Sequence, residues 1–66
     1  MLASELKVGQ WIKSTVCMQG HKLAPSVVIG VHLNESTPFV RVKELFGSYP
    51  GHDIIPEQEV ELCQSS

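Results

Sequence analysis

Two cysteines and three histidines are the residues of this 66-residue chain that could bind a metal or act as nucleophile and base. Cys17 and His21 are separated by three residues, whereas His32, His52 and Cys63 lie far apart. Structural zinc sites generally present two close ligand pairs such as C-x2-C, and only one close pair occurs here. A thiol nucleophile needs a base, an orienting group and walls that exclude water, which so short a chain can hardly supply. We therefore expect free, partly buried thiols and surface histidines, with no metal, cofactor or catalytic residue.

Aromatic side chains are the second group with functional potential, because large rings supply much of the contact energy at protein interfaces. The chain has only four of them, so a small core could also require them. Trp11 and Tyr49, which is followed by Pro50, fit a binding patch as well as a core. Phe46 is expected to fill the core.

Acidic residues gather in the second half of the chain, at Asp53, Glu57, Glu59 and Glu61. Such a run commonly forms a solvated strand edge that discourages pairing between sheets. It can also steer a basic partner toward a docking surface. The candidate partner-binding residues are Trp11, Tyr49, Asp53, Glu57 and Glu59.

Composition restricts the class of protein. A hydrophobic fraction of 42% and a charged fraction of 18% are typical of a folded globular domain. The net charge of −2 makes sequence-independent binding to nucleic acid unfavourable. The chain begins without the pattern of a signal peptide and has no apolar run of the ~20 residues that a membrane span needs. We therefore expect a cytoplasmic protein with one domain over residues 1–66.

The elements that must position these residues are expected to be short strands. The clearest pattern covers residues 26–33, where Val27, Ile29, Val31 and Leu33 alternate on one face, and Gly30 on the other marks a bend or a close approach. The expected strands are 10–18, 26–33, 39–45, 52–55 and 60–62, with one tight helical turn over 56–59. The residues expected in the core are Val27, Ile29, Val31, Val40, Val42, Ile54, Val60 and Leu62. Leu2, Leu6 and Val8 are expected to cover an open end.

This order of elements resembles that of SH3-like barrels, all-β folds of about five short antiparallel strands with a helical turn before the last one. The residues that carry the resemblance are Val8-Gly9-Gln10-Trp11-Ile12, Val28-Ile29-Gly30-Val31, Val40-Arg41-Val42, Ile54-Ile55-Pro56 and Val60-Glu61-Leu62. Within that architecture, Ser48 to Pro56 is similar to the penultimate strand of the type II plasmid dihydrofolate reductase. That family binds its ligands with Gln-Ile-Tyr, where this chain has Asp53, Ile54 and Ile55, so the activity is not expected here.

These observations favour a non-enzymatic protein–protein interaction or regulatory module. A chain of this length buries only about 60% of its unfolded surface, so self-association, most simply as a homodimer, is also expected. Two alternatives remain open. One is a nucleic-acid-binding barrel that uses Lys13, Lys22, Arg41 and Lys43, and the other is an oligomeric enzyme with a pore-like site.

Overall fold

The fold is all-β. The computed structural model describes residues 1–47 and 49–63, and within them the strands are short and antiparallel. The elements are a 3-10 turn η1 (Ala3–Glu5), β1 (Trp11–Ile12), β2 (Thr15–Val16), β3 (Lys22–Leu23), β4 (Ser26–His32), β5 (Phe39–Glu44) and β6 (His52–Ile54). No helix in this part of the chain is long and apolar enough to cross a membrane.

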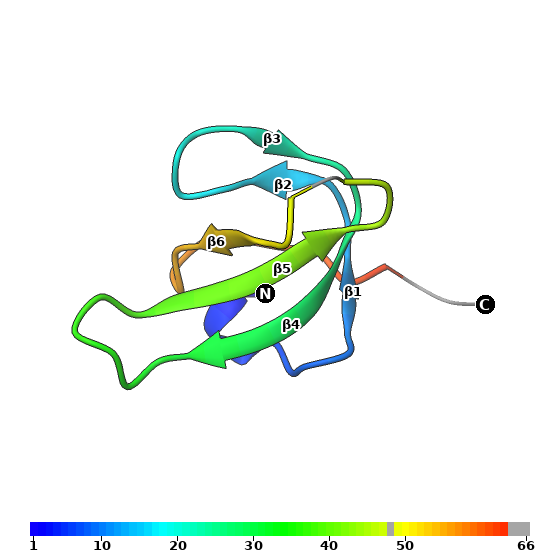
Figure 1. The fold of residues 1–66 in the computed structure, drawn as a ribbon. Helices are drawn as coiled ribbons and strands as arrows, with labels where there is room; N and C mark the ends of the chain where they lie inside the picture. Colours follow the sequence, from blue (N-terminus) through cyan, green and yellow to red (C-terminus); the bar gives the residue numbers. More distant parts are fainter. Residues whose placement is uncertain (48, 64–66) are drawn as a thin grey trace.

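The strands form two sheets. One has the order β1-β4-β5-β6, and the other is the hairpin of β2 and β3, which lies beyond β6 at the top of Figure 1. The single strand expected over 10–18 is therefore divided between the two sheets. Ser14, at the division, donates a hydrogen bond from its hydroxyl to the carbonyl oxygen of Leu23, which ties the start of the hairpin to its end. The stretch 19–26, expected to be a loop, supplies β3.

A β-bulge divides β4 and reverses the expected orientation of the side chains up to Ile29, whereas Val31 faces the core as expected. Val28 is paired with Val42 and Gly30 with Arg41, so Ile29 is the extra residue. Before the bulge, Ser26 and Val28 face the core; after it, Val31 packs against the core. The expectation that Val27 and Ile29 face inward was wrong: Val27 is half-buried and Ile29 is 41% exposed.

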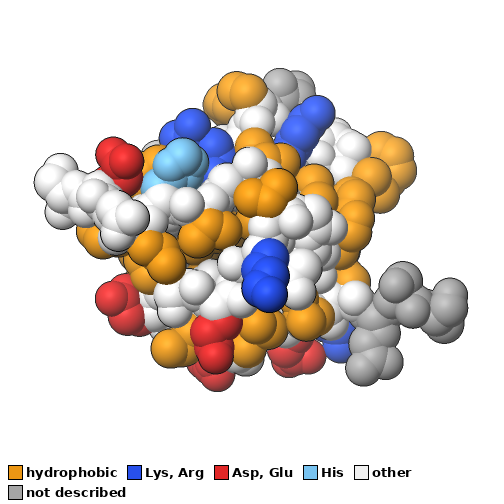
Figure 2. Space-filling model, turned by 90° about the horizontal axis from the view of Figure 1, so that it is seen from below, with side chains coloured by type: hydrophobic (Ala, Val, Ile, Leu, Met, Phe, Trp, Pro, Cys, Tyr) orange, Lys and Arg blue, Asp and Glu red, His pale blue; other side chains and the backbone are white. Residues whose placement is uncertain are grey.

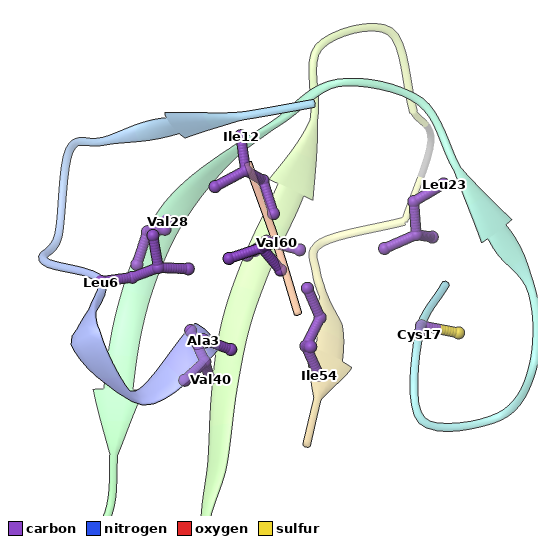
Figure 3. Packing of buried hydrophobic residues seen from close by; sticks show 10 residues of the cluster. Ala3, Leu6, Ile12, Cys17, Leu23, Val28, Val40, Ile54 and Val60 are labelled. Atoms are coloured by element: carbon purple, nitrogen blue, oxygen red, sulfur yellow. The ribbon is translucent and has the colours of Figure 1, made fainter. Parts of the chain in front are cut away.

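The core lies between the four-stranded sheet and the segments near the two ends of the chain. Its buried residues are Ala3, Leu6, Ile12, Cys17, Leu23, Val28, Val40, Val42, Ile54 and Val60. Figure 3 shows Ala3 and Leu6 beside Val28 and Val40, with Val60 between Ile12 and Ile54, whereas Leu23 and Cys17 come from the hairpin. The inward positions expected for Val40, Val42, Ile54 and Val60 are confirmed.

The segments near the two ends hold each other in place. The Ala3 N–H donates to the Gln58 carbonyl at 2.8 Å, and the Val60 N–H donates to the Met1 carbonyl at 2.7 Å. Residues 61–63 also run beside β1, where Ile12 and Leu62 form an isolated antiparallel bridge. The ladders of the described residues do not close into a complete barrel.

Several expectations near the chain ends and turns need correction. The helical turn lies at Ala3–Glu5, whereas residues 56–59 contain a turn in which the Gln58 N–H donates to the Ile55 carbonyl at 3.0 Å. Leu62, expected in the core, is 37% exposed in the segment that pairs along the edge of β1. Phe46, expected in the core, is 93% exposed in the turn after β5. Of the residues expected to cover an open end, Leu6 is buried, but Leu2 and Val8 are exposed.

The bulge yields a prediction about two isoleucines. Ile54→Ala removes a fully buried side chain and should lower the free energy of unfolding by about 2–5 kcal/mol. Ile29→Ala should cost about 1 kcal/mol or less, because its side chain is largely outside the core. Urea denaturation of the two variants compares these costs. A larger loss for Ile29→Ala would contradict the bulge.

Candidate functional site

The solvent-facing side of the four-stranded sheet carries large apolar side chains. Trp11 on β1 is directly opposite Val27 on β4, and Val27 is opposite Lys43 on β5. Residues opposed in this way have Cβ atoms about 4.5–5.5 Å apart on one face of a sheet. Trp11 is 39% exposed and Val27 is half-buried. Trp11, Val27 and Lys43 therefore form a continuous row across three strands.

Ile29, Arg41 and Asp53 form the neighbouring row. A Cβ atom built on Gly51 would lie 3.1 Å from Arg41 Cγ and Cδ and 3.4 Å from Ile29 Cδ1, so glycine allows both side chains to lie over this position. Arg41 Nε donates to Asp53 Oδ1 at 2.9 Å. This hydrogen bond, aided by the charge of the carboxylate, raises the pKa of Arg41. The pair is exposed, so it orients Arg41 more than it stabilises the fold.

An aromatic stack continues the same side of the sheet toward the β4–β5 loop. The rings of His32 and Phe39 are stacked with centroids 4.6 Å apart, and the Arg41 guanidinium carbon lies 5.1 Å from the Phe39 centroid. The His32 ring also lies over Gly30, where a Cβ atom would be 2.7 Å from His32 Nε2. We define the outer face as the solvent-facing side chains Trp11, Val27, Ile29, His32, Phe39, Arg41, Lys43 and Asp53.

A separate hollow of about 530 Å³ lies between the β2–β3 hairpin and the ends of β5 and β6. At its wall, Glu44 Oε2 accepts the Ala24 N–H at 2.8 Å, and Glu44 Oε1 is 3.1 Å from His52 Nε2. The Tyr49 ring meets the His52 ring edge-on, with centroids 5.5 Å apart. Both oxygens of Glu44 are thus engaged within the chain, and His52 is held between a carboxylate and a phenol ring.

The hollow has an imidazole, that of His52, oriented by Glu44 and Tyr49. Its described lining contains no serine, threonine or cysteine. Cys17 is buried nearby in the hairpin, and its Sγ lies 3.6 Å from Gln19 Oε1. Both cysteines are free thiols, and no three or more His, Cys, Asp or Glu side chains among the described residues are grouped to hold a metal ion.

The five candidate partner-binding residues lie in three places. Trp11 and Asp53 are on the outer face, on the first and last strands of the sheet, and Tyr49 lines the hollow. Glu57 and Glu59 are exposed in the segment that pairs with the chain start, where Glu59 forms an ion pair with the Met1 amino group at 3.6 Å. The acidic run is therefore divided between different surfaces of the protein.

The apolar residues that accompany Trp11 were not among the candidates, because the alternation in 26–33 predicted Val27 and Ile29 in the core. Gly30 was the available signal, since a glycine inside a strand often marks a bulge. A bulge there would have turned Ile29 toward the solvent. Comparison with protein-family models, curated proteins and solved structures gave no match to this chain.

The wall of the hollow yields a prediction. Glu44→Ala leaves the Ala24 N–H and His52 without their acceptor and should lower the free energy of unfolding by about 0.5–1.5 kcal/mol. Glu44→Gln keeps a side-chain acceptor and should lose less. Glu57→Ala, at an exposed site, is the control. Urea denaturation with NMR of the Ala24 amide tests this, and equal stability of the three variants would contradict the role of Glu44.

Proposed function

We propose that this chain is a non-enzymatic protein-binding module that docks its partner through the outer face. The observation that carries the proposal is the apolar area formed by Trp11, Val27 and Ile29 on the solvent side of the sheet. A tryptophan beside aliphatic side chains offers a rigid anchor of the kind that dominates binding energy in protein interfaces. The sheet beneath it is held by the core, so the face needs little ordering on binding.

The charges of the outer face favour a partner with acidic residues. The face has Arg41 and Lys43 against one carboxylate, Asp53, which is already paired with Arg41. Lys43 forms no ion pair with another described residue. Elsewhere, Glu59 is paired with the Met1 amino group, and Glu61 with Lys13 at 3.3 Å. The proposed partner is therefore an apolar segment flanked by acidic side chains, rather than the basic partner that the acidic run alone would favour.

We also propose that the chain is an SH3-like domain and that it is located in the cytoplasm. The first strand, the two long strands and the short strand follow one another in the order expected for that architecture, while the β2–β3 hairpin takes the place of the expected loop. Two free thiols fit a reducing compartment. Both points support the proposal, and neither identifies the partner.

Trp11 allows a direct test, because it is the only tryptophan of the chain and lies on the outer face. An acidic, apolar peptide selected from a displayed peptide library should shift Trp11 emission to shorter wavelength as the ring loses contact with water. Lys43→Glu should weaken binding of this peptide about tenfold, through the loss of a favourable charge and the gain of a repulsive one.

Lys22→Glu is the matched control, since it makes the same charge change on the exposed side of the β2–β3 hairpin. It should leave peptide affinity within about twofold of the original. An equal loss in both variants would contradict docking on the outer face. Tighter binding of a single-stranded oligonucleotide than of the selected peptide would favour the nucleic-acid alternative instead.

A further inference from the structure

The far half of β4 has an unpaired edge. β1 pairs with Ser26 and Val27, and the Val28 N–H and C=O then bond to Gln10 and Gly9 at 2.8 Å each. Because the bulge lies between them, Val28 and Val31 face the same side, and we infer that the Val31 backbone groups point toward this same edge. No backbone hydrogen bond joins Val31 or Leu33 through that edge to another described segment.

The residues at this edge have few features that would prevent another strand from pairing with it. The segment 26–33 contains no lysine, arginine, aspartate or glutamate, and it contains no proline. Val8, next to the Gly9 that bonds to Val28, is 65% exposed, and Ile29 and Leu33 are each 41% exposed. Figure 2 views the molecule from below, on the β4 side of Figure 1, and shows hydrophobic side chains spread across this face with a few charged side chains among them. Sheets normally guard such an edge with charges, prolines or a covering segment.

We propose that a second copy of this chain pairs with the free edge of β4. The two β4 strands would run antiparallel about a two-fold axis near Val31, so that each copy presents the same residues to the other. Val31 of each copy would exchange backbone hydrogen bonds across the axis. The exposed side chains of Val8, Ile29 and Leu33 would lose contact with water on both sides of the new strand pair.

The charges at the two ends of the edge support a second copy as the occupant. Glu35 follows β4 by three residues and lies in the bend of the β4–β5 loop, at the far end of the free edge. Lys7 lies at the other end, just before the segment that bonds to Val28. Antiparallel pairing therefore brings Glu35 of each copy toward Lys7 of the other. An unrelated strand would have no reason to match both charges.

This inference goes beyond the proposed function, because it concerns assembly of the chain with itself rather than recognition of another protein. A small domain buries little apolar surface in its own core, and pairing of two copies would bury more. The edge is distinct from the row of Trp11, Val27 and Lys43, so this row of the outer face stays open in such a dimer, whereas Ile29 borders the new strand pair.

Sedimentation equilibrium of the full chain and five variants tests the dimer. Lys7→Glu and Glu35→Lys should each weaken dimerisation about tenfold, because each dimer contains the pair twice. The double variant K7E/E35K should regain most of the original affinity, since the charges are exchanged. Leu33→Lys should give a monomer, and Glu57→Lys, which makes the same charge change at an exposed site away from this edge, is the control.

Circular dichroism and urea denaturation establish that each variant is folded. A monomer of the unmodified chain at a concentration of about 100 μM would overturn the proposal, as would additive losses in the double variant. The proposal would also be overturned if Glu57→Lys weakened dimerisation as much as Glu35→Lys does. If Leu33→Lys is a monomer that still binds the selected acidic peptide, the dimer and the outer face are separate properties. Loss of peptide binding with an intact dimer would instead count against the proposed function alone.

Discussion

The bulge at Ile29 in β4 determines how the sheet is used. Without it, every second residue from Ser26 onward would face the core, and Gly30 would take an inward position that offers no side chain for packing. With it, Val28 and Val31 both face inward, while Ile29 joins Val27 on the solvent side. This one inserted residue therefore determines which side chains of β4 enter the core and which apolar side chains join the outer face. It also determines which way the backbone groups of the free edge point.

Gly30 and the His32–Phe39 stack show how the bulge is accommodated. The His32 ring occupies the space where a side chain on residue 30 would lie, and it is held there by stacking on Phe39. Arg41, opposite the bulge, lies over Phe39 and is fixed by Asp53 on β6. The bulge thus organises charged and aromatic side chains from three strands into one surface. Hydrogen bonds between the two ends of the chain enclose the other side of the core and make the small fold depend on contacts distant in sequence.

The sequence predicts the strands better than their faces. β5 and β6 were anticipated because Val40 and Val42 alternate with charged residues and because turn residues surround both strands. Alternation failed in β4, since a pattern of period two cannot indicate where one residue is inserted. Phe46 was misplaced because hydrophobicity suggested burial, whereas its position in a turn exposes it. Of the outer face, Trp11 and Asp53 were singled out from residue type alone, but the sequence could not show that Val27 and Ile29 lie beside them.

The orientation of Ile29 and Val31 is the central claim, and proton–proton nuclear Overhauser effects from their methyl groups measure it directly. We expect Ile29 Cδ1 protons to show contacts with the α-protons of Gly51 and with the side chain of Arg41, and Val31 methyl protons to show contacts with the core. Contacts from the Ile29 methyl groups to Ile54 or Val40, with Val31 facing Arg41, would contradict the bulge. The outer face and the free edge would then both lose their basis.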